Sequence, residues 1–358
     1  MNPADSIFSR DNGPRDEVTG DLVVRSFAKI NLFLRVGDVD AYGFHPLVSW
    51  MVSTSLADTL TFWLSRSDQL SIELTCDDPT IPTDETNLVS KAIRLFFSHD
   101  DLSDAASKIA IRVGIKKNIP SGGGLGGGSS NAAVTLVTLQ KLFRTDIALH
   151  PLAVRLGSDV PFFLEGASQL AQGRGELLSP APKPESALWA VLILPIKLAV
   201  NTGACYRRLD ELRRDLRPIA QQNTLDQPDI TALSKLGPAE LMDELVNDLE
   251  APAFAIVPEL GELRKQMERL AGRVVRMTGS GSTLFTLAAD QHDARDIESR
   301  LQANLPANFE QVRTCVVRLA ADAVVVEWPP KSALQQSALQ QSARQQSAGP
   351  ILLQEATC

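Results

Sequence analysis

One glycine-rich segment limits what this chain can fold into more than any other. It runs from Ile119 to Ala133 and holds six glycines in seven residues, followed by Ser129, Ser130 and Asn131. Glycine reaches positive φ at little cost, so the backbone N–H groups of such a run can converge on an anion. A helix is expected over 132–143, with the two serines and the asparagine as candidate N-caps. A glycine loop at a helix N-terminus predicts a phosphate site.

Two common phosphate-binding motifs do not fit this segment. Gly122, Gly124 and Gly127 satisfy GxGxxG, but no second strand ends in an acid at the distance that a dinucleotide site requires. A Walker A loop fails as well, because Ser129 stands where that motif needs lysine. A flexible glycine linker is the other interpretation. The alternating strand pattern over 109–115 and the helix pattern after the loop argue against it.

Composition excludes several classes of function. The chain has 358 residues, 44% hydrophobic and 22% charged, with a formal net charge of −8 that argues against a general nucleic-acid binder. Its four cysteines form no CxxC pair and its four histidines show no metal-ligand spacing, so reduced cysteines and no protein-held metal are expected. The longest apolar run, 187–194, is too short to span a bilayer, and the acidic start lacks a signal sequence. A cytoplasmic protein is expected.

Strand and helix patterns mix without strict alternation, which predicts an α+β fold. Strands are expected at 22–36 (one or two), within 47–64, and at 70–75, 109–115, 187–194, 273–277, 283–288, 311–318 and 323–328, with a hairpin or turn within 166–178. Helices are expected at 89–97 (capped by Thr86 or Asn87), 132–143, 204–215, 238–249, 258–271 and 291–303. The strand at 323–328 is expected to complete the second half of the chain.

Four segments are expected along the chain, with the boundary between two domains in the proline-rich stretch 180–184. They are a flexible leader (1–21), an N-terminal domain (22–180), a C-terminal domain (181–328) and a low-complexity disordered tail with Ser-Ala-Leu-Gln-Gln repeats (329–358).

Several polar residues outside the loop allow two interpretations each. Lys29 and Asn31 share one face of a strand, where a solvated lysine is the ordinary alternative to a ligand contact. Asp159 precedes a proline-containing helix start, so it could cap that helix or serve as a general base. His45 follows Phe44 in a turn, where it is either solvated or bound with that ring to a planar group. A second glycine turn, 277–282, could be a plain strand connection.

Three blocks in order, K-I-N-L, P-x-G-G-G-L-G-G-G-S-S-N-A-A and T-G-S-G-S, resemble the GHMP kinases. S-x-A-K-I-N-L-F-L, L-G-S-D-V-P-F-F and N-D-L-E (Asn247 to Glu250) are similar to one branch of that family. Members of this branch phosphorylate 4-diphosphocytidyl-2-C-methyl-D-erythritol in non-mevalonate isoprenoid precursor biosynthesis. The resemblance covers about residues 22–328. It implies a ribosomal-protein-S5-like N-terminal domain (domain 2 of that protein), an α+β C-terminal domain and a site in the cleft between them.

The resemblance also implies roles for individual residues. Asp159 would accept the proton of the substrate C2 hydroxyl, and Lys29 would keep Asp159 ionised and steady the developing charge. The product would be the 2-phosphate, with ADP. The residues expected to wrap the phosphates of ATP are Pro120, Ser121, Gly122, Gly123, Gly124, Leu125, Gly126, Gly127, Gly128, Ser129 and Ser130.

The same resemblance implies how the substrate is bound. Phe44 and Tyr206 would sandwich the cytosine ring, and His45 would bond its edge. The remaining substrate contacts would be Asn31, Lys117 and Thr202. ATP would enter with Mg²⁺ as the co-substrate, and the partners would be small molecules, without nucleic acid or membrane, in a monomer or weak homodimer.

The chain departs from the family pattern in three respects. Phe44 stands where the family often has tyrosine, the segment between Asn131 and Asp159 is a little short, and no acidic Mg²⁺ ligand is evident beyond a contribution from Ser130. Two alternatives stay open. One is another GHMP kinase acting on homoserine, mevalonate or a sugar, and the other is a non-catalytic ligand-sensing protein of this fold. The aromatic residues argue against the first, and retention of Asp159 and Lys29 argues against the second.

Overall fold

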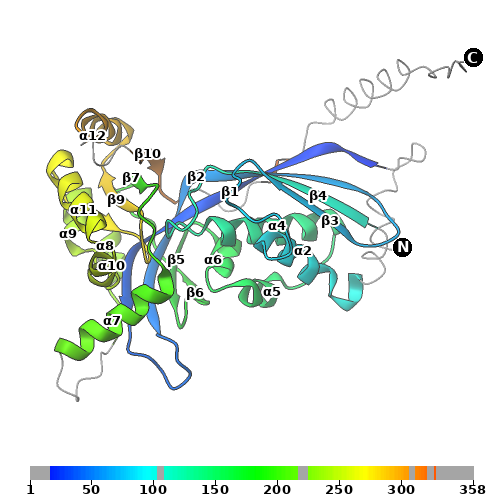
Figure 1. Cartoon of the computed structure of the whole chain (residues 1–358), viewed down its shortest axis with the longest axis horizontal. Coiled ribbons are helices and arrows are strands. Elements are labelled where there is room, and N and C mark those ends of the chain that lie inside the picture. Colours follow the sequence, from blue (N-terminus) through cyan, green and yellow to red (C-terminus); the bar gives the residue numbers. More distant parts are fainter. Residues whose placement is uncertain (1–16, 103–108, 217–224, 306–310, 321–325, 328–358) are drawn as a thin grey trace, which may run out of the picture.

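A computed structural model describes residues 17–102, 109–216, 225–305, 311–320 and 326–327. Two β-sheets organise these residues, with one group of helices packed on each (Figure 1). The α+β class predicted from the sequence is therefore confirmed. Most of the predicted leader and all of the predicted tail lie outside the described residues, and the domain boundaries stay a prediction.

The larger sheet has seven strands in the order β11-β1-β2-β4-β3, with β5 paired to β2 and β6 to β5. Among its described strands, β3 and β4 are the only pair that runs parallel. Its strands are β1 (Glu17–Val36), β2 (Leu47–Arg66), β3 (Ser71–Cys76), β4 (Ile109–Lys116), β5 (Ser168–Gln172), β6 (Leu177–Pro180) and β11 (Val326–Glu327). Residues 22–36, where one or two strands were expected, form part of the single long strand β1. The hairpin expected within 166–178 is confirmed as β5 and β6.

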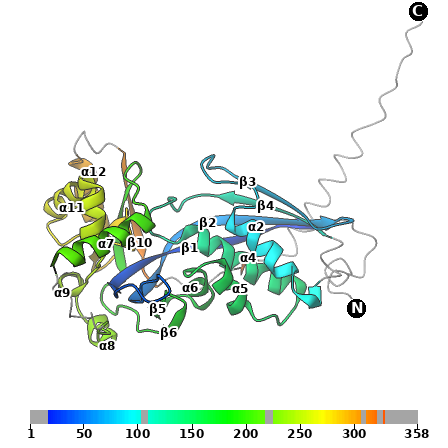
Figure 2. The same ribbon diagram turned by 60° about the horizontal axis from the view of Figure 1, so that its bottom comes forward.

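Helices pack on one face of this sheet (Figure 2). They are α2 (Leu88–Phe97), α4 (Gly127–Phe143), α5 (Leu149–Leu156) and α6 (Val160–Glu165). A short 3-10 helix, η1 (Asp100–Leu102), follows α2. Their apolar sides bury Phe96, Phe143 and Phe162 against Phe62 of β2, which forms the core of this half. Asn87 caps α2, as one of the two predicted caps, by accepting from the Val89 N–H.

The helix after the glycine run begins earlier than predicted. It starts at Gly127, and its N-cap is Gly126 in the left-handed conformation at φ 71°. The prediction of Ser129, Ser130 or Asn131 as the cap is therefore wrong. A left-handed glycine turns the chain into the helix without a side-chain cap, so the serines and the asparagine lie inside the first turns.

The second sheet is antiparallel, with the order β10-β7-β9-β8. Its strands are β7 (Trp189–Pro195), β8 (Arg276–Met277), β9 (Leu284–Ala288) and β10 (Val312–Arg318). The helices of this half are α7 (Thr202–Leu216), α8 (Ile230–Ser234), α9 (Pro238–Glu244), α10 (Glu250–Ile256), α11 (Pro258–Ala271) and α12 (Gln291–Ala303). Buried Val191, Leu263, Met267 and Ile297 join the sheet to these helices.

Three expectations for this half need correction. The helix predicted at 238–249 ends at Glu244 as α9, because the backbone after it turns to pair with β1 through a bridge between Asn247 and Leu34, and the next helix, α10, begins only at Glu250. The strand predicted at 273–277 is only two residues long. The last described strand, β11, pairs with β1 of the larger sheet rather than with the second sheet. Among the described residues, no helix is long and apolar enough to cross a membrane.

Candidate active site

Strand β1 reaches both glycine turns because two of the three irregularities in its pairing with β2 lie beside Lys29 and Asn31. Register shifts occur between Phe27 and Lys29 and between Asn31 and Phe33. The Lys29 N–H donates to the Leu125 carbonyl at 3.0 Å, in the first glycine turn. The Asn31 N–H donates to Thr278 Oγ1 at 2.7 Å, at the second. Bulges of this kind re-aim side chains and free backbone groups, so one strand anchors two loops that are distant in the sequence.

The two glycine turns contact each other through their backbones. The Thr283 N–H donates to the Gly123 carbonyl at 3.3 Å. Gly124 has φ 76°, and a Cβ added to it would lie 2.7 Å from the carbonyl oxygen of Thr278. Glycine is required at 124 by both backbone conformation and space. The turn at 277–282 is therefore more than a strand connection, because it closes over the first glycine loop.

The segment N-D-L-E (Asn247 to Glu250), which leads from α9 into α10, holds the second glycine turn in place. Asn247 donates from Nδ2 to the carbonyls of Met277 and Gly279, both at 2.8 Å. The Glu250 carboxylate accepts from the Met277 N–H at 2.7 Å. Burial raises the pKa of Glu250. These bonds tie the second glycine turn to the helices of the second half.

Lys29 and Asp159 meet beside the first glycine turn. Lys29 Nζ lies 3.6 Å from Asp159 Oδ2 and donates to Asn31 Oδ1 at 2.6 Å. The lysine side chain is only 5% exposed, so the solvated-lysine alternative is wrong. Asp159 precedes α6 but makes no side-chain capping bond, and 36% of its side chain is exposed. Its carboxylate is thus free of the capping role and open to a ligand.

A buried carboxylate that the sequence analysis missed anchors the start of the glycine loop. Asp58 on β2 is fully buried, and its Oδ1 accepts from the backbone N–H groups of Asn118 and Ile119 at 2.8 Å each. Its Oδ2 accepts from Lys117 Nζ at 2.5 Å and from Asn131 Nδ2 at 3.1 Å. Burial of a charge is tolerated when it is paired and fully bonded. In the sequence, the only indication of this role is that Asp58 is a charged residue within a mostly apolar strand.

The pairing with Asp58 decides where the Lys117 ammonium lies. Nζ is 3.1 Å from the position that a Cβ on Gly127 would take, at the first residue of α4. The Lys117 ammonium therefore lies at the N-terminus of α4, where the helix dipole already favours an anion. Ser130 is buried nearby, and Ser26 Oγ donates to its Oγ at 2.7 Å. Among the described residues, no group of three or more His, Cys, Asp or Glu could hold a metal ion.

The predicted substrate aromatics lie on two different elements. The His45 ring, in the loop between β1 and β2, lies 5.2 Å from the Tyr206 ring on α7. Phe44 is 46% exposed, and the Arg174 guanidinium lies over its ring at 3.4 Å from the centroid. Thr202, at the start of α7, is 2.8 Å from Ser280 of the second glycine turn, Oγ1 to Oγ.

Tyr206 links this aromatic group to the Lys29–Asp159 pair. Burial, with a smaller contribution from the Asp159 charge, raises the pKa of Tyr206 to about 12. Asp159 is thus near enough to Tyr206 for its charge to act on the phenol. The structure thus gathers the two glycine turns and the Lys29–Asp159 pair, and it packs the His45 ring against Tyr206, although these residues come from separate stretches of sequence.

Comparison with known proteins agrees with this arrangement. The model of the GHMP kinases N terminal domain matches residues 87–167, and that of the GHMP kinases C terminal domain matches residues 229–307. The 4-diphosphocytidyl-2-C-methyl-D-erythritol kinase of Leifsonia xyli is 33% identical over 290 residues, 78% of this chain and 92% of the relative. That of Moorella thermoacetica is 35% identical over 292 residues, 80% and 96% of the two chains.

Solved structures give the same result. A crystal structure of 4-(cytidine 5'-diphospho)-2C-methyl-D-erythritol kinase is 33% identical, with a TM-score of 0.66 over 84% of this chain and 100% of its own. Homoserine kinase from Cytophaga hutchinsonii, at 19% identity and TM-score 0.61, shares the fold. The chain is a two-domain kinase of the GHMP type. Within that class it belongs to the 4-diphosphocytidyl-2-C-methyl-D-erythritol kinase family, which confirms the resemblance found in the motifs.

Proposed function

We propose that the chain transfers the γ-phosphoryl group of ATP to the C2 hydroxyl of 4-diphosphocytidyl-2-C-methyl-D-erythritol, giving the 2-phosphate and ADP. The observation that carries the proposal is the Lys29–Asp159 pair at 3.6 Å, beside the first glycine turn. Phosphoryl transfer needs positioning and charge stabilisation more than covalent help. The relatives at 33–35% identity carry the name of this activity.

In this proposal, the first glycine loop binds the phosphates of ATP. Backbone N–H groups of residues 122–128 and the N-terminus of α4 face the phosphate oxygens. The resemblance assigned Lys117 to the acceptor substrate, but its ammonium beside Gly127 is proposed instead to add a positive charge at the phosphates of ATP. Mg²⁺ enters with ATP as part of the co-substrate. A Mg²⁺ ion commonly keeps waters and takes few protein ligands, so the donor set of Ser130 and nucleotide phosphates is adequate.

Asp159 acts as the general base in the same proposal. Its exposed carboxylate takes the hydroxyl proton as the oxygen attacks the γ-phosphorus, and the proton ends on Oδ of Asp159. Lys29 holds that carboxylate in place and, with Asn31, faces the negative charge that develops on the transferred group. Phe44, His45, Thr202 and Tyr206 bind the cytidine end of the substrate.

An ADP-release assay tests the proposal directly. The purified chain is incubated with ATP, Mg²⁺ and either the cytidine diphosphate substrate, mevalonate or homoserine. Saturable ADP release with the first substrate alone is the expected result. Turnover of mevalonate or homoserine without it would overturn the substrate assignment. Binding of ATP without turnover of any acceptor would instead indicate a ligand-sensing protein.

Replacing Gly124 with alanine should raise the KM for ATP about tenfold, because a left-handed alanine costs roughly 1–2 kcal/mol and the added Cβ meets the Thr278 carbonyl. Steady-state kinetics at varied ATP measure this change. Gly237→Ala is the matched control, since its φ is −66° and its nearest contact would be 3.6 Å away. Equal KM values in the two variants would contradict the contact between the glycine turns.

Replacing Tyr206 with phenylalanine should leave the alkaline side of the pH–rate profile unchanged. With a pKa raised to about 12, the phenol stays protonated until the pH approaches that value, so it does not titrate in the working range. The ring that would stack on the base is kept. Kcat and kcat/KM measured from pH 7 to 10 check this expectation, and loss of a basic limb in the variant would contradict it.

A further inference from the structure

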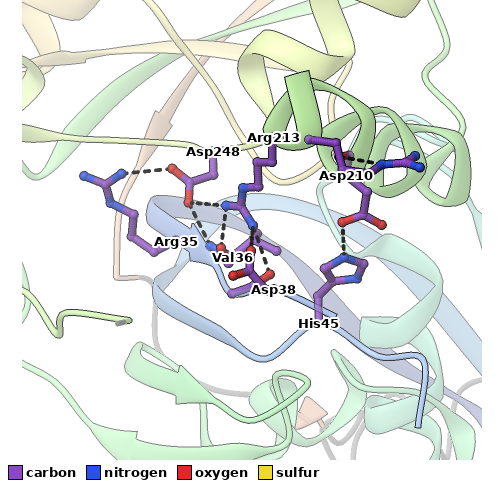
Figure 3. A network of polar contacts seen from close by, with 9 residues as sticks. Arg35, Val36, Asp38, His45, Asp210, Arg213 and Asp248 are labelled. Atoms are coloured by element: carbon purple, nitrogen blue, oxygen red, sulfur yellow. Dashed lines mark hydrogen bonds and ion pairs between the residues drawn. The ribbon is translucent and has the colours of Figure 1, made fainter. Parts of the chain in front are cut away.

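The His45 ring is held by a carboxylate on the second half of the chain. Nε2 of His45 lies 2.8 Å from Oδ1 of Asp210 on α7, one turn after Tyr206 (Figure 3). The two side chains are 10% and 33% exposed, so the bond is partly shielded from water. Removing a partly shielded bond of this kind therefore changes the free energy of the site more than removing a fully exposed ion pair.

A second contact holds α7 against the chain that leads to His45. Arg213, three residues after Asp210, donates from Nη2 to the Val36 carbonyl at 2.6 Å and from Nη1 to the Gly37 carbonyl at 3.0 Å (Figure 3). Asp248 accepts from Arg213 Nη2 at 3.3 Å and from the Val36 N–H at 3.0 Å. The helix carrying Asp210 is thus fixed to the end of β1.

The loop that carries His45 is itself ordered by short bonds. The Gly37 N–H donates to the Pro46 carbonyl at 2.6 Å and closes the loop at its base. Asp40 Oδ1 accepts from the N–H groups of Tyr42 and Phe44 at 2.8 and 2.9 Å. Because both the loop with His45 and the helix with Asp210 are held by these bonds, the fold fixes the orientation of the imidazole ring.

The chemistry of the bond selects one tautomer of His45. An ionised carboxylate only accepts hydrogen bonds, so Nε2 carries the hydrogen and the neutral ring presents Nδ1 as an acceptor. Within the described part of the chain, Nδ1 makes no hydrogen bond. Asp210 and Asp40 are carboxylates near this ring, and the Tyr206 ring packs against it.

We propose that Asp210 is a positioning residue that sets base specificity by holding His45 with Nδ1 as an acceptor. An acceptor at this place fits the exocyclic amino group of cytosine and opposes the carbonyl that uracil carries at the same position. The inference rests on the proposed function, because that function places a pyrimidine against His45. A site that hydrogen-bonds one group rejects an analogue that cannot pair with it.

The tautomer can be read in the protein without any substrate. The chain has four histidines, so ¹⁵N-labelled imidazole signals are few, and His45→Gln identifies those of His45 by their loss. At the alkaline end of a pH series, where the ring is neutral, the expected wild-type spectrum shows hydrogen on Nε2. Hydrogen on Nδ1 would overturn the inference. Asp210→Asn should give a mixture, because an amide can either accept from Nε2 or donate to it.

Base specificity is measured by binding, so that it does not depend on turnover. Calorimetry compares CDP with UDP while a non-hydrolysable ATP analogue saturates the ATP site. We expect the wild-type chain to prefer CDP, and Asp210→Asn to reduce that preference by about tenfold. Glu211→Gln, the neighbouring exposed carboxylate on α7, is the matched control and should keep the preference.

The outcomes separate this inference from the proposed function. Equal affinity of the wild-type chain for CDP and UDP, or an unchanged preference in Asp210→Asn, overturns the role of Asp210 even if the chain phosphorylates the cytidine substrate. Absence of turnover with the cytidine substrate, combined with a CDP preference that Asp210→Asn removes, overturns the proposed reaction and leaves the role of Asp210 in place. Thermal unfolding of each variant shows that it is folded.

Discussion

Replacing Asp159 with asparagine should lower kcat by about 10²–10⁴-fold, the usual contribution of a general base. Asparagine has nearly the same size but cannot take the proton of the attacking hydroxyl. The carboxylate makes no capping bond to α6, so the variant keeps the helix. ATP binding should change little, because the glycine loop and Lys117 are untouched. Steady-state kinetics with the cytidine diphosphate substrate, together with calorimetry of the ATP analogue, measure both effects.

Asp243→Asn is the control for this experiment. Asp243 is exposed on α9, and the same loss of charge there should leave kcat unchanged. A wild-type kcat in Asp159→Asn would remove Asp159 from the role of base. A large loss of ATP affinity in that variant would also count against the assignment, because it would indicate that the carboxylate acts in nucleotide binding.

Local patterns in the sequence predict the parts of this site that are built locally. The glycine run predicts a loop with positive φ from its composition alone, because glycine adopts positive φ at little cost. The structure gives φ near 71–76° at Gly122, Gly124 and Gly126. Asn87 as a cap follows from its place before an apolar period. The start of α4 was mispredicted because serine and asparagine are good caps in general, whereas here a left-handed glycine makes the turn.

Tertiary contacts explain what the sequence could not predict. Asp58 is bonded to Lys117 and Asn131, 59 and 73 residues away, so nothing local distinguishes it from any other strand aspartate. Asp210 and Arg213 look like ordinary charges on an exposed helix until α7 is placed against the loop after β1. The pairing of β11 with β1 also joins residues that are far apart in the sequence. Long-range pairing leaves no periodic signal.

The second large effect is expected for Lys29→Met, which should lower kcat by about 10²–10³-fold, the loss typical of removing one preorganised stabiliser of charge. Methionine fills much of the same space but carries no ammonium within 3.6 Å of Asp159. The backbone bond from residue 29 to the Leu125 carbonyl is kept, so the glycine loop stays anchored to β1. Asn31 Oδ1 loses its donor, which should cost about 1–3 kcal/mol of stability, measured by thermal unfolding.

A double variant distinguishes a working pair from two independent residues. If Lys29 acts by holding and stabilising Asp159, the combined Lys29→Met and Asp159→Asn chain should be about as slow as the slower single variant. Lys235→Met, at an exposed lysine next to α8, is the control for loss of charge and should keep the wild-type kcat. Losses that multiply in the double variant would show that the lysine acts on the transferred phosphoryl group independently of the carboxylate.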